Sequence, residues 1–211
     1  MSEHEPGRHA HSAEEWDERY SGEQVWSGNP NEALVAEATG LTAGRALDVG
    51  CGEGADSVWL ARQGWQVTAL DISRKAVART EAMAVDAGVE VEGVAAGLLE
   101  APLPEASYDL VIAMYPALLR TPTDVAEQRL LDLVATRGTL LVVHHADIDP
   151  EHAREHGCDP DDYVSPDDVR ALAVARGGWA VVADERRERA TVLGGAGAHH
   201  RNDLVVRLQR R

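Results

Sequence analysis

The residues whose types and spacing best suit chemistry form a glycine-rich segment. Residues 48–54 read Asp-Val-Gly-Cys-Gly-Glu-Gly, an acid followed by glycines at alternate positions. Glycines allow positive φ angles and let a ligand approach the backbone closely, and the helical pattern that follows (55–62) turns its first N–H groups toward the same space. Asp71 ends the next predicted strand, where it can accept hydrogen bonds from two ribose hydroxyls. The pattern predicts the first half of a nucleotide-binding α/β sheet.

Two cofactors fit this pattern. Residues 50–55 satisfy the dinucleotide motif G-x-G-x-x-G/A, so a nicotinamide-dependent oxidoreductase is one interpretation. Asp48, however, places an acid at the turn, which disfavours a pyrophosphate and suits a cationic ligand with an amine, such as S-adenosylmethionine (SAM). We therefore favour SAM and keep the oxidoreductase as an alternative.

Several segments also resemble one family, the class I SAM-dependent methyltransferases. Residues 48–54 and 71–73 are similar to its first two motifs. Residues 108–112 are similar to its fourth strand, and residues 137–142 to the approach to its fifth. The resemblance implies an α/β, Rossmann-like fold, with a seven-stranded mostly parallel sheet, an antiparallel last strand and helices on both faces.

The amino-terminal segment resembles the lid of a smaller group. Residues 16–20 and 25–31 are similar to the lid of small-molecule methyltransferases related to the tellurite-resistance and thiopurine enzymes. We predict lid helices over residues 13–40, inside a single domain of residues 13–211. A disordered tail over residues 1–12 is expected to precede them.

The resemblance implies which residues contact SAM, and which later contact the product S-adenosylhomocysteine (SAH). Asp48 and the glycine turn would lie near the methionine moiety, Asp71 at the ribose and Ile72 against the adenine. The lid aromatics would either shield the sulfonium with their ring faces or simply pack the first helix. The implied contacts are Tyr20, Trp26, Asp48, Gly50, Cys51, Gly52, Asp71, Ile72, Gly97, Leu98 and Met114.

One position departs from the family pattern. Gly97 stands where relatives usually have an acid that binds the adenine amino group. The backbone N–H of Leu98 could still read the ring, or Glu100 could substitute for the acid. The departure keeps open a second alternative, a SAM- or SAH-binding regulatory protein without transfer activity.

Histidine pairs mark the ends of two predicted strands. His144 and His145 end the fifth strand, and His199 with His200 precedes the last one. Because the last strand runs antiparallel beside the fifth, both pairs should meet near the methyl acceptor. We predict that His144, His145, His199 and Tyr115 supply a general base or orient the acceptor, with ordinary surface or packing histidines as the alternative. Imidazoles also suit Zn, Ni or Cu, but the pairs lack helical i, i+4 spacing, so we predict no metal.

Motif and charge both bear on the acceptor and the partners. The fourth strand ends in Ala-Met-Tyr-Pro (113–116), without the Asn/Asp-Pro-Pro-aromatic motif of enzymes that methylate DNA bases or glutamine. The net charge of −16 argues against nucleic acid or an anionic membrane as a partner. We expect a small-molecule acceptor, methylated by in-line displacement, and a monomer or homodimer. With neither a signal sequence nor an apolar run of membrane-spanning length, a cytoplasmic protein is expected.

Overall fold

The computed structural model describes residues 12–155, 159–189 and 201–211. Its centre is a seven-stranded sheet in the order β3-β2-β1-β4-β5-β7-β6. Strands β1 to β5 are parallel, and β7 lies antiparallel between β5 and β6. The strands are β1 (Arg45–Val49), β2 (Gln66–Asp71), β3 (Val91–Ala95), β4 (Tyr108–Met114), β5 (Val134–His145), β6 (Trp179–Glu188) and β7 (Asn202–Arg210). The predicted fold class is confirmed, whereas the tail of residues 1–12 lies outside the described residues except for Ser12.

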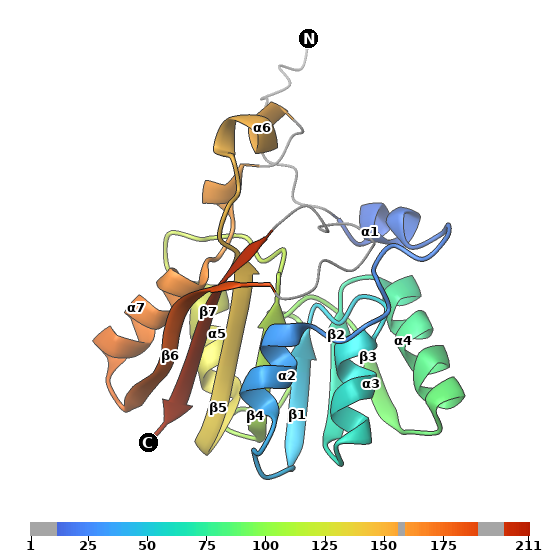
Figure 1. Ribbon diagram of the computed structural model, residues 1–211, viewed down its shortest axis with the longest axis horizontal. Helices are drawn as coiled ribbons and strands as arrows, with labels where there is room; N and C mark the ends of the chain where they lie inside the picture. Colours follow the sequence, from blue (N-terminus) through green and yellow to red (C-terminus); the bar gives the residue numbers. More distant parts are fainter. Residues whose placement is uncertain (1–11, 156–158, 190–200) are drawn as a thin grey trace.

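Helices cover both faces of this sheet (Figure 1). They are α1 (Ala13–Arg19), α2 (Glu32–Ala38), α3 (Ala55–Arg62), α4 (Arg74–Ala87), α5 (Val125–Leu133), α6 (Pro150–Glu155) and α7 (Pro166–Arg176), with a short 3₁₀ helix at Pro160–Asp162. Their ends follow the local sequence. Ser12 and Ser165 form capping boxes at α1 and α7, and Gly88 ends α4 in the left-handed conformation. Among the described residues, no helix has the length and apolar character that crossing a membrane requires.

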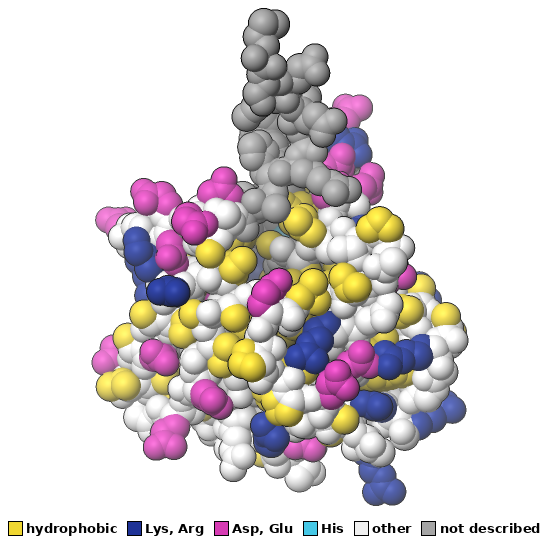
Figure 2. Space-filling view, turned by 180° about the vertical axis from the view of Figure 1, so that it is seen from behind, with side chains coloured by type: hydrophobic (Ala, Val, Ile, Leu, Met, Phe, Trp, Pro, Cys, Tyr) yellow, Lys and Arg dark blue, Asp and Glu magenta, His cyan; other side chains and the backbone are white. Residues whose placement is uncertain are grey.

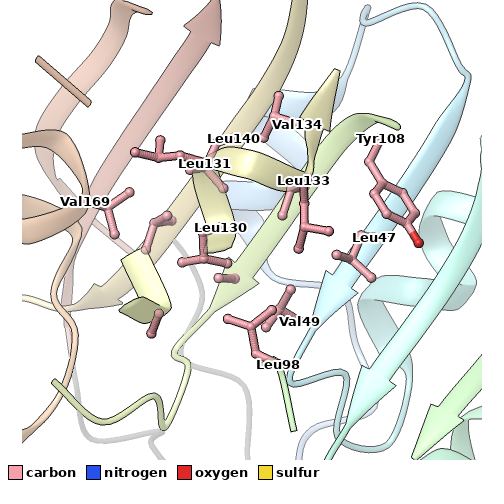
Figure 3. Packing of buried hydrophobic residues seen from close by; sticks show 14 of the residues in the cluster. Leu47, Val49, Leu98, Tyr108, Leu130, Leu131, Leu133, Val134, Leu140 and Val169 are labelled. Carbon is pink, nitrogen blue, oxygen red and sulfur yellow. The ribbon is translucent and has the colours of Figure 1, made fainter. Parts of the chain in front are cut away.

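Two apolar clusters hold the layers together. On one face, side chains of α2 and α3 pack against β1, β4 and β5. On the other face, leucines of α5 and a valine of α7 point toward side chains of β1 and β5 (Figure 3). Strands β4 and β5 are buried on both sides and read as near-continuous apolar runs, as expected for central parallel strands.

The fifth strand begins earlier than the sequence pattern indicates. The pattern predicts a helix to residue 135 and a strand from residue 139, but α5 ends at Leu133 and β5 starts at Val134. Arg137 adopts a positive φ of 66°, and the pairing with β4 shifts register between Tyr108 and Leu110. The extra residues therefore form an irregular strand start rather than a last helical turn.

Candidate active site

A cavity of about 410 Å³ opens at the carboxyl ends of the parallel strands. Open α/β sheets bind ligands at this edge, where the strand order reverses. The wall comes from the turn after β1, the ends of β2, β4 and β5, the segment after β3, and the lid segment that includes α1 and the start of α2. One continuous space therefore connects the glycine turn with the predicted acceptor residues.

The glycine turn has the conformation that its sequence predicts. Gly50, Gly52 and Gly54 have φ angles of 77°, 53° and 89°. A Cβ on Gly54 would lie 2.8 Å from the Cα of Thr80, whereas a Cβ on Gly50 would have no neighbour within 4 Å. Gly54 thus brings α3 and α4 together, and the open space at Gly50 is where a ligand can approach the backbone.

Asp71 lies at the tip of β2, next to this turn. Its carboxylate accepts hydrogen bonds from the backbone N–H groups of Gly52 (3.0 Å) and Ser73 (2.9 Å). Burial raises the pKa of Asp71, and these two N–H groups oppose that effect. The neighbouring Ile72 is 38% exposed and lines the cavity. Both residues lie where a ribose and an adenine ring were predicted.

Asp48 lies beneath the turn and is absent from the cavity wall. It is 2% exposed and accepts a hydrogen bond from the hydroxyl of Ser57 at 2.6 Å. Burial and the nearby Asp56 raise the pKa of Asp48. We expected Asp48 to contact the methionine moiety of SAM, but its side chain does not reach the cavity wall. Glu53 and Asp56, two other acids near the turn, do reach the wall.

Three carboxylates attach the lid to the domain. Glu53 accepts hydrogen bonds from the backbone N–H groups of Val25 (3.1 Å) and Trp26 (2.8 Å) and also pairs with Arg79. Asp56 accepts two hydrogen bonds from Asn31, at 2.7 and 2.6 Å. From the lid side, Asp17 accepts from Ser73 Oγ (2.6 Å) and from the backbone of Lys75 (3.1 Å). Sequence reasoning missed these anchors because the partners are 25 to 58 residues apart.

The lid aromatics line the cavity and also pack against one another. Trp16 and Tyr20 stack with ring centroids 5.9 Å apart, and Trp26 Nε1 donates a hydrogen bond to Tyr20 Oη at 3.0 Å. Burial raises the pKa of Tyr20 to about 12. A Cβ on Gly52 would lie 3.2 Å from both polar atoms of this pair, so the lid sits directly on the glycine turn. The contacts support the interpretation that these aromatics pack the lid, and shielding of the sulfonium by their ring faces stays a prediction.

At the adenine end, Gly97 and Leu98 line the cavity as expected. A Cβ on Gly97 would collide with the carboxylate of Glu100, which folds back over this position. An acid is therefore present beside Gly97, supplied by the following turn. Glu100 itself is not one of the residues that line the cavity, so its role as a substitute for the missing acid stays a prediction.

At the acceptor end, β4 and β5 bring Met114, Tyr115, His144 and His145 to the cavity wall. Tyr115 has a φ of 52°, an outlier for a bulky residue, and such strain gathers at functional sites. Its ring stacks on that of His145, with centroids 4.3 Å apart. His199 lies outside the described residues. Among the residues that the structure does describe, no group of three or more histidines, cysteines or acids could hold a metal ion.

Two further residues join this end, and sequence reasoning missed both. Asp203 on β7 is directly opposite His145 in the ladder and 4% exposed. It accepts a hydrogen bond from Tyr115 Oη at 2.8 Å, and its other oxygen lies 3.6 Å from Nδ1 of His145. Arg189 lines the cavity, with Nε 3.8 Å from Asp203 and the guanidinium 5.8 Å from the Tyr115 ring centroid. The antiparallel pairing of β5 with β7 was predicted, but only the register of this pairing reveals that His145 faces Asp203.

Residues 46–138 match a protein family described as "Methyltransferase domain". Among curated proteins, the chain is 34% identical over 122 residues to an uncharacterized methyltransferase of Mycobacterium tuberculosis, covering 57% of this chain and 61% of that protein. It is 57% identical over 42 residues to ribosomal RNA small subunit methyltransferase C of Alcanivorax borkumensis, covering 19% and 13%. It is 37% identical over 102 residues to the ubiquinone biosynthesis O-methyltransferase of Ralstonia nicotianae, covering 47% and 42%. The chain thus spans less than two thirds of the length of each of these relatives.

Solved structures share the fold over most of the chain. A structure from work on the conversion of a disulfide bond into a thioacetal group during echinomycin biosynthesis has a TM-score of 0.73 at 24% identity, covering 94% of this chain and 92% of that one. The N-methyltransferase NodS from Bradyrhizobium japonicum, in complex with SAH, has a TM-score of 0.66 at 17% identity, covering 94% and 97%. The [4+2]-cyclase SpnF has a TM-score of 0.63 at 22% identity, covering 84% and 78%. Residues 46–138 are therefore similar to the methyltransferase-domain family, and the chain shares its overall fold with these solved structures.

Proposed function

We propose that this protein transfers a methyl group from SAM to a small-molecule acceptor by in-line displacement. The observation that carries the proposal is the single cavity that joins a cofactor-type end to an acceptor-type end under one lid. Its volume of about 410 Å³ lies within the range of small-molecule sites. SAM, when bound, supplies an electrophilic methyl group on a sulfonium.

The residues of the cofactor end fit SAM. The turn at Gly50 leaves room for a ligand beside the backbone, and Asp71 presents a carboxylate at the ribose position. Glu53 and Asp56 also reach the wall, which places acids rather than bases beside a cationic ligand, although Glu53 pairs with Arg79 and burial raises the pKa of Asp56. Among the described cavity-lining residues, Arg189 is the only lysine or arginine, and it lies at the other end. This charge distribution disfavours a dinucleotide pyrophosphate and so disfavours the oxidoreductase alternative.

The lid supplies positioning and exclusion of water. Trp16, Tyr20 and Trp26 form an aromatic wall over the turn, and carboxylate anchors hold them there. Holding donor and acceptor in line inside a dry site can contribute a large part of the rate enhancement of a displacement. The lid's resemblance to tellurite-resistance and thiopurine enzymes supports a small acceptor.

The surface supports the same class of acceptor. Over the face shown in Figure 2, acidic and basic side chains are interspersed and do not gather into one broad basic patch. The net charge of −16 would repel RNA or DNA, although one partial relative acts on ribosomal RNA by name. The relative named for ubiquinone biosynthesis points to a small molecule instead.

Calorimetric titration with SAM, SAH and NAD tests the cofactor. We expect micromolar binding of both adenosyl ligands, its loss in Asp71→Ala, and its retention in Asp86→Ala, which removes an exposed acid from α4. Binding of NAD alone would overturn the proposal. Because the [4+2]-cyclase SpnF shares the fold, transfer of a labelled methyl group to a panel of thiol, phenol and alcohol acceptors is the second requirement. Tight SAM binding without transfer to any acceptor would favour the regulatory alternative.

A further inference from the structure

The chemistry of the acceptor depends on which side chain can take its proton. Three described side chains of suitable type line the acceptor end: Tyr115, His144 and His145. Each has a different set of partners. These partners determine which of the three has an atom that can accept a proton.

His144 is held as a neutral hydrogen-bond donor. Its Nδ1 accepts a hydrogen bond from the backbone N–H of His145 at 3.0 Å, so the ring proton belongs on Nε2. Burial, together with the neighbouring His145, lowers the pKa of His144 to about 4. At neutral pH this ring can therefore donate a hydrogen bond to a substrate, but its one basic nitrogen is already in use.

Tyr115 is committed in a similar way. Its hydroxyl donates to Asp203 Oδ2 at 2.8 Å. Burial and the negative charge of Asp203 raise the pKa of Tyr115, so the phenolate is not formed near neutral pH. The hydroxyl fixes the carboxylate rather than acting as a base.

His145 has the opposite arrangement to His144. Its Nδ1 lies 3.6 Å from Asp203 Oδ1, and its ring is clamped against Tyr115. A carboxylate beside Nδ1 favours a proton on that nitrogen and makes Nε2 the basic one. The separation is longer than a hydrogen bond, and catalytic contacts of this kind commonly shorten when substrate binds. Among the residues that the structure describes, the groups that face His145 include Asp203 from β7, Tyr115 after β4, His144 from β5 and Arg189 after β6.

The geometry points to His145 as the general base of methyl transfer, to Asp203 as the residue that positions it, and to a hydroxyl-bearing small molecule as the acceptor. This inference rests on the proposed function. As the acceptor oxygen bonds to the methyl carbon, the carbon–sulfur bond breaks and the sulfonium becomes the neutral thioether of SAH. The hydroxyl proton passes to Nε2 of His145, and Asp203 stabilises the resulting imidazolium until the proton leaves to solvent. A thiol ionises near neutral pH without help, whereas a phenol or alcohol needs such a base.

The first test requires neither cofactor nor substrate. Nitrogen-15 spectra of the imidazole rings should place the proton of His144 on Nε2 and that of His145 on Nδ1, with His144→Gln and His145→Gln assigning the signals. Asp203→Asn keeps an acceptor for Tyr115 but removes the charge, so the proton of His145 should redistribute between its nitrogens while His144 is unchanged. Identical tautomers at both histidines, or no response of His145 to Asp203→Asn, would overturn the pairing.

The second test uses methyl transfer to a series of phenols. His145→Gln should lower kcat by about 10²- to 10⁴-fold for phenols that are protonated at the assay pH. It should lower kcat much less for acidic phenols that are already ionised, and Asp203→Asn should show the same trend with a smaller loss. His144→Gln is the matched control, since it should raise KM and leave the difference between the two kinds of phenol as in the wild type. An equal loss for all phenols in His145→Gln would refute the role of base while leaving the proposed function intact. If the wild type binds SAM and methylates no acceptor, the proposed function fails. The nitrogen-15 spectra would still show whether Asp203 keeps the proton of His145 on Nδ1.

Discussion

Replacement of Glu53 by glutamine should release the lid without unfolding the domain. The Glu53 carboxylate, 9% exposed, accepts the N–H groups of Val25 and Trp26 and pairs with Arg79. Glutamine has nearly the same volume but keeps one neutral acceptor oxygen for two N–H donors. Hydrogen bonds to charged groups contribute about 1.5–3 kcal/mol each, so opening of the lid should become easier by about that amount. At about 1.4 kcal/mol per factor of ten, this corresponds to about 10- to 150-fold in the opening equilibrium.

Amide hydrogen exchange measures this opening directly. The amides of Val25 and Trp26 should exchange about 10- to 150-fold faster in Glu53→Gln, because their acceptor has changed. The amides of Leu130 and Leu131 in the buried helix α5 should be unaffected. Glu18→Gln, which changes an exposed side chain of the lid helix α1, is the matched control and should alter neither set.

Two results would refute this reasoning. Unchanged exchange of Val25 and Trp26 in Glu53→Gln would mean that the carboxylate does not hold the lid. Equal acceleration of all amides, including those of α5, would mean that Glu53 stabilises the whole domain instead. If the lid must close on the cofactor, the affinity for SAM should fall by up to the same factor as the exchange rises.

Two further predictions concern the residues beneath the lid. Gly54→Ala should destabilise the domain by about 2–5 kcal/mol, because a Cβ would meet the Thr80 backbone at a positive φ. Gly64→Ala, with a similar φ of 90° but no close neighbour, should cost only about 1–2 kcal/mol, and equal urea midpoints for the two variants would contradict this. Asp48→Asn should stabilise the protein most at alkaline pH. Burial raises the pKa of Asp48 in the native state, so the native state binds this proton more tightly than the unfolded state does. The stability of the wild type therefore falls as the pH rises above 3.8, the ordinary pKa of an aspartate. The difference in free energy of unfolding between Asp48→Asn and wild type should therefore shrink as pH is lowered toward 4, and a constant difference in urea titrations would show that Asp48 is not a buried, protonated acid.

Much of the fold was predictable because its signals are local. A glycine turn or an apolar run acts within a few residues of itself, and the structure confirms the predicted positive φ angles of the turn at Gly50. The predicted start of β5 was wrong, because an irregular strand residue such as Arg137 leaves no periodic pattern of apolar residues in the sequence.

The site was predictable only in part. Parallel strands bring their carboxyl ends to one edge, so Asp71, Tyr115, His144 and His145 could be placed near the cavity from sequence order alone. Their individual roles could not be assigned in this way, because a histidine's role depends on which nitrogen already has a partner. For His144 that partner is a backbone N–H one residue away.

The sequence by itself thus determined the glycine turn and the cofactor-type edge, because short-range sterics and hydrophobic periodicity specify the turn and the strands around it, whereas the sheet architecture was implied by the resemblance to a known family. Only the tertiary structure decided that Asp48 lies beneath the turn while Glu53 and Asp56 hold the lid. It also decided that Asp203 faces His145, since this depends on the register between β5 and β7. Register and lid docking are settled by packing between segments distant in the chain, and no local pattern of residues encodes which atoms those segments bring together.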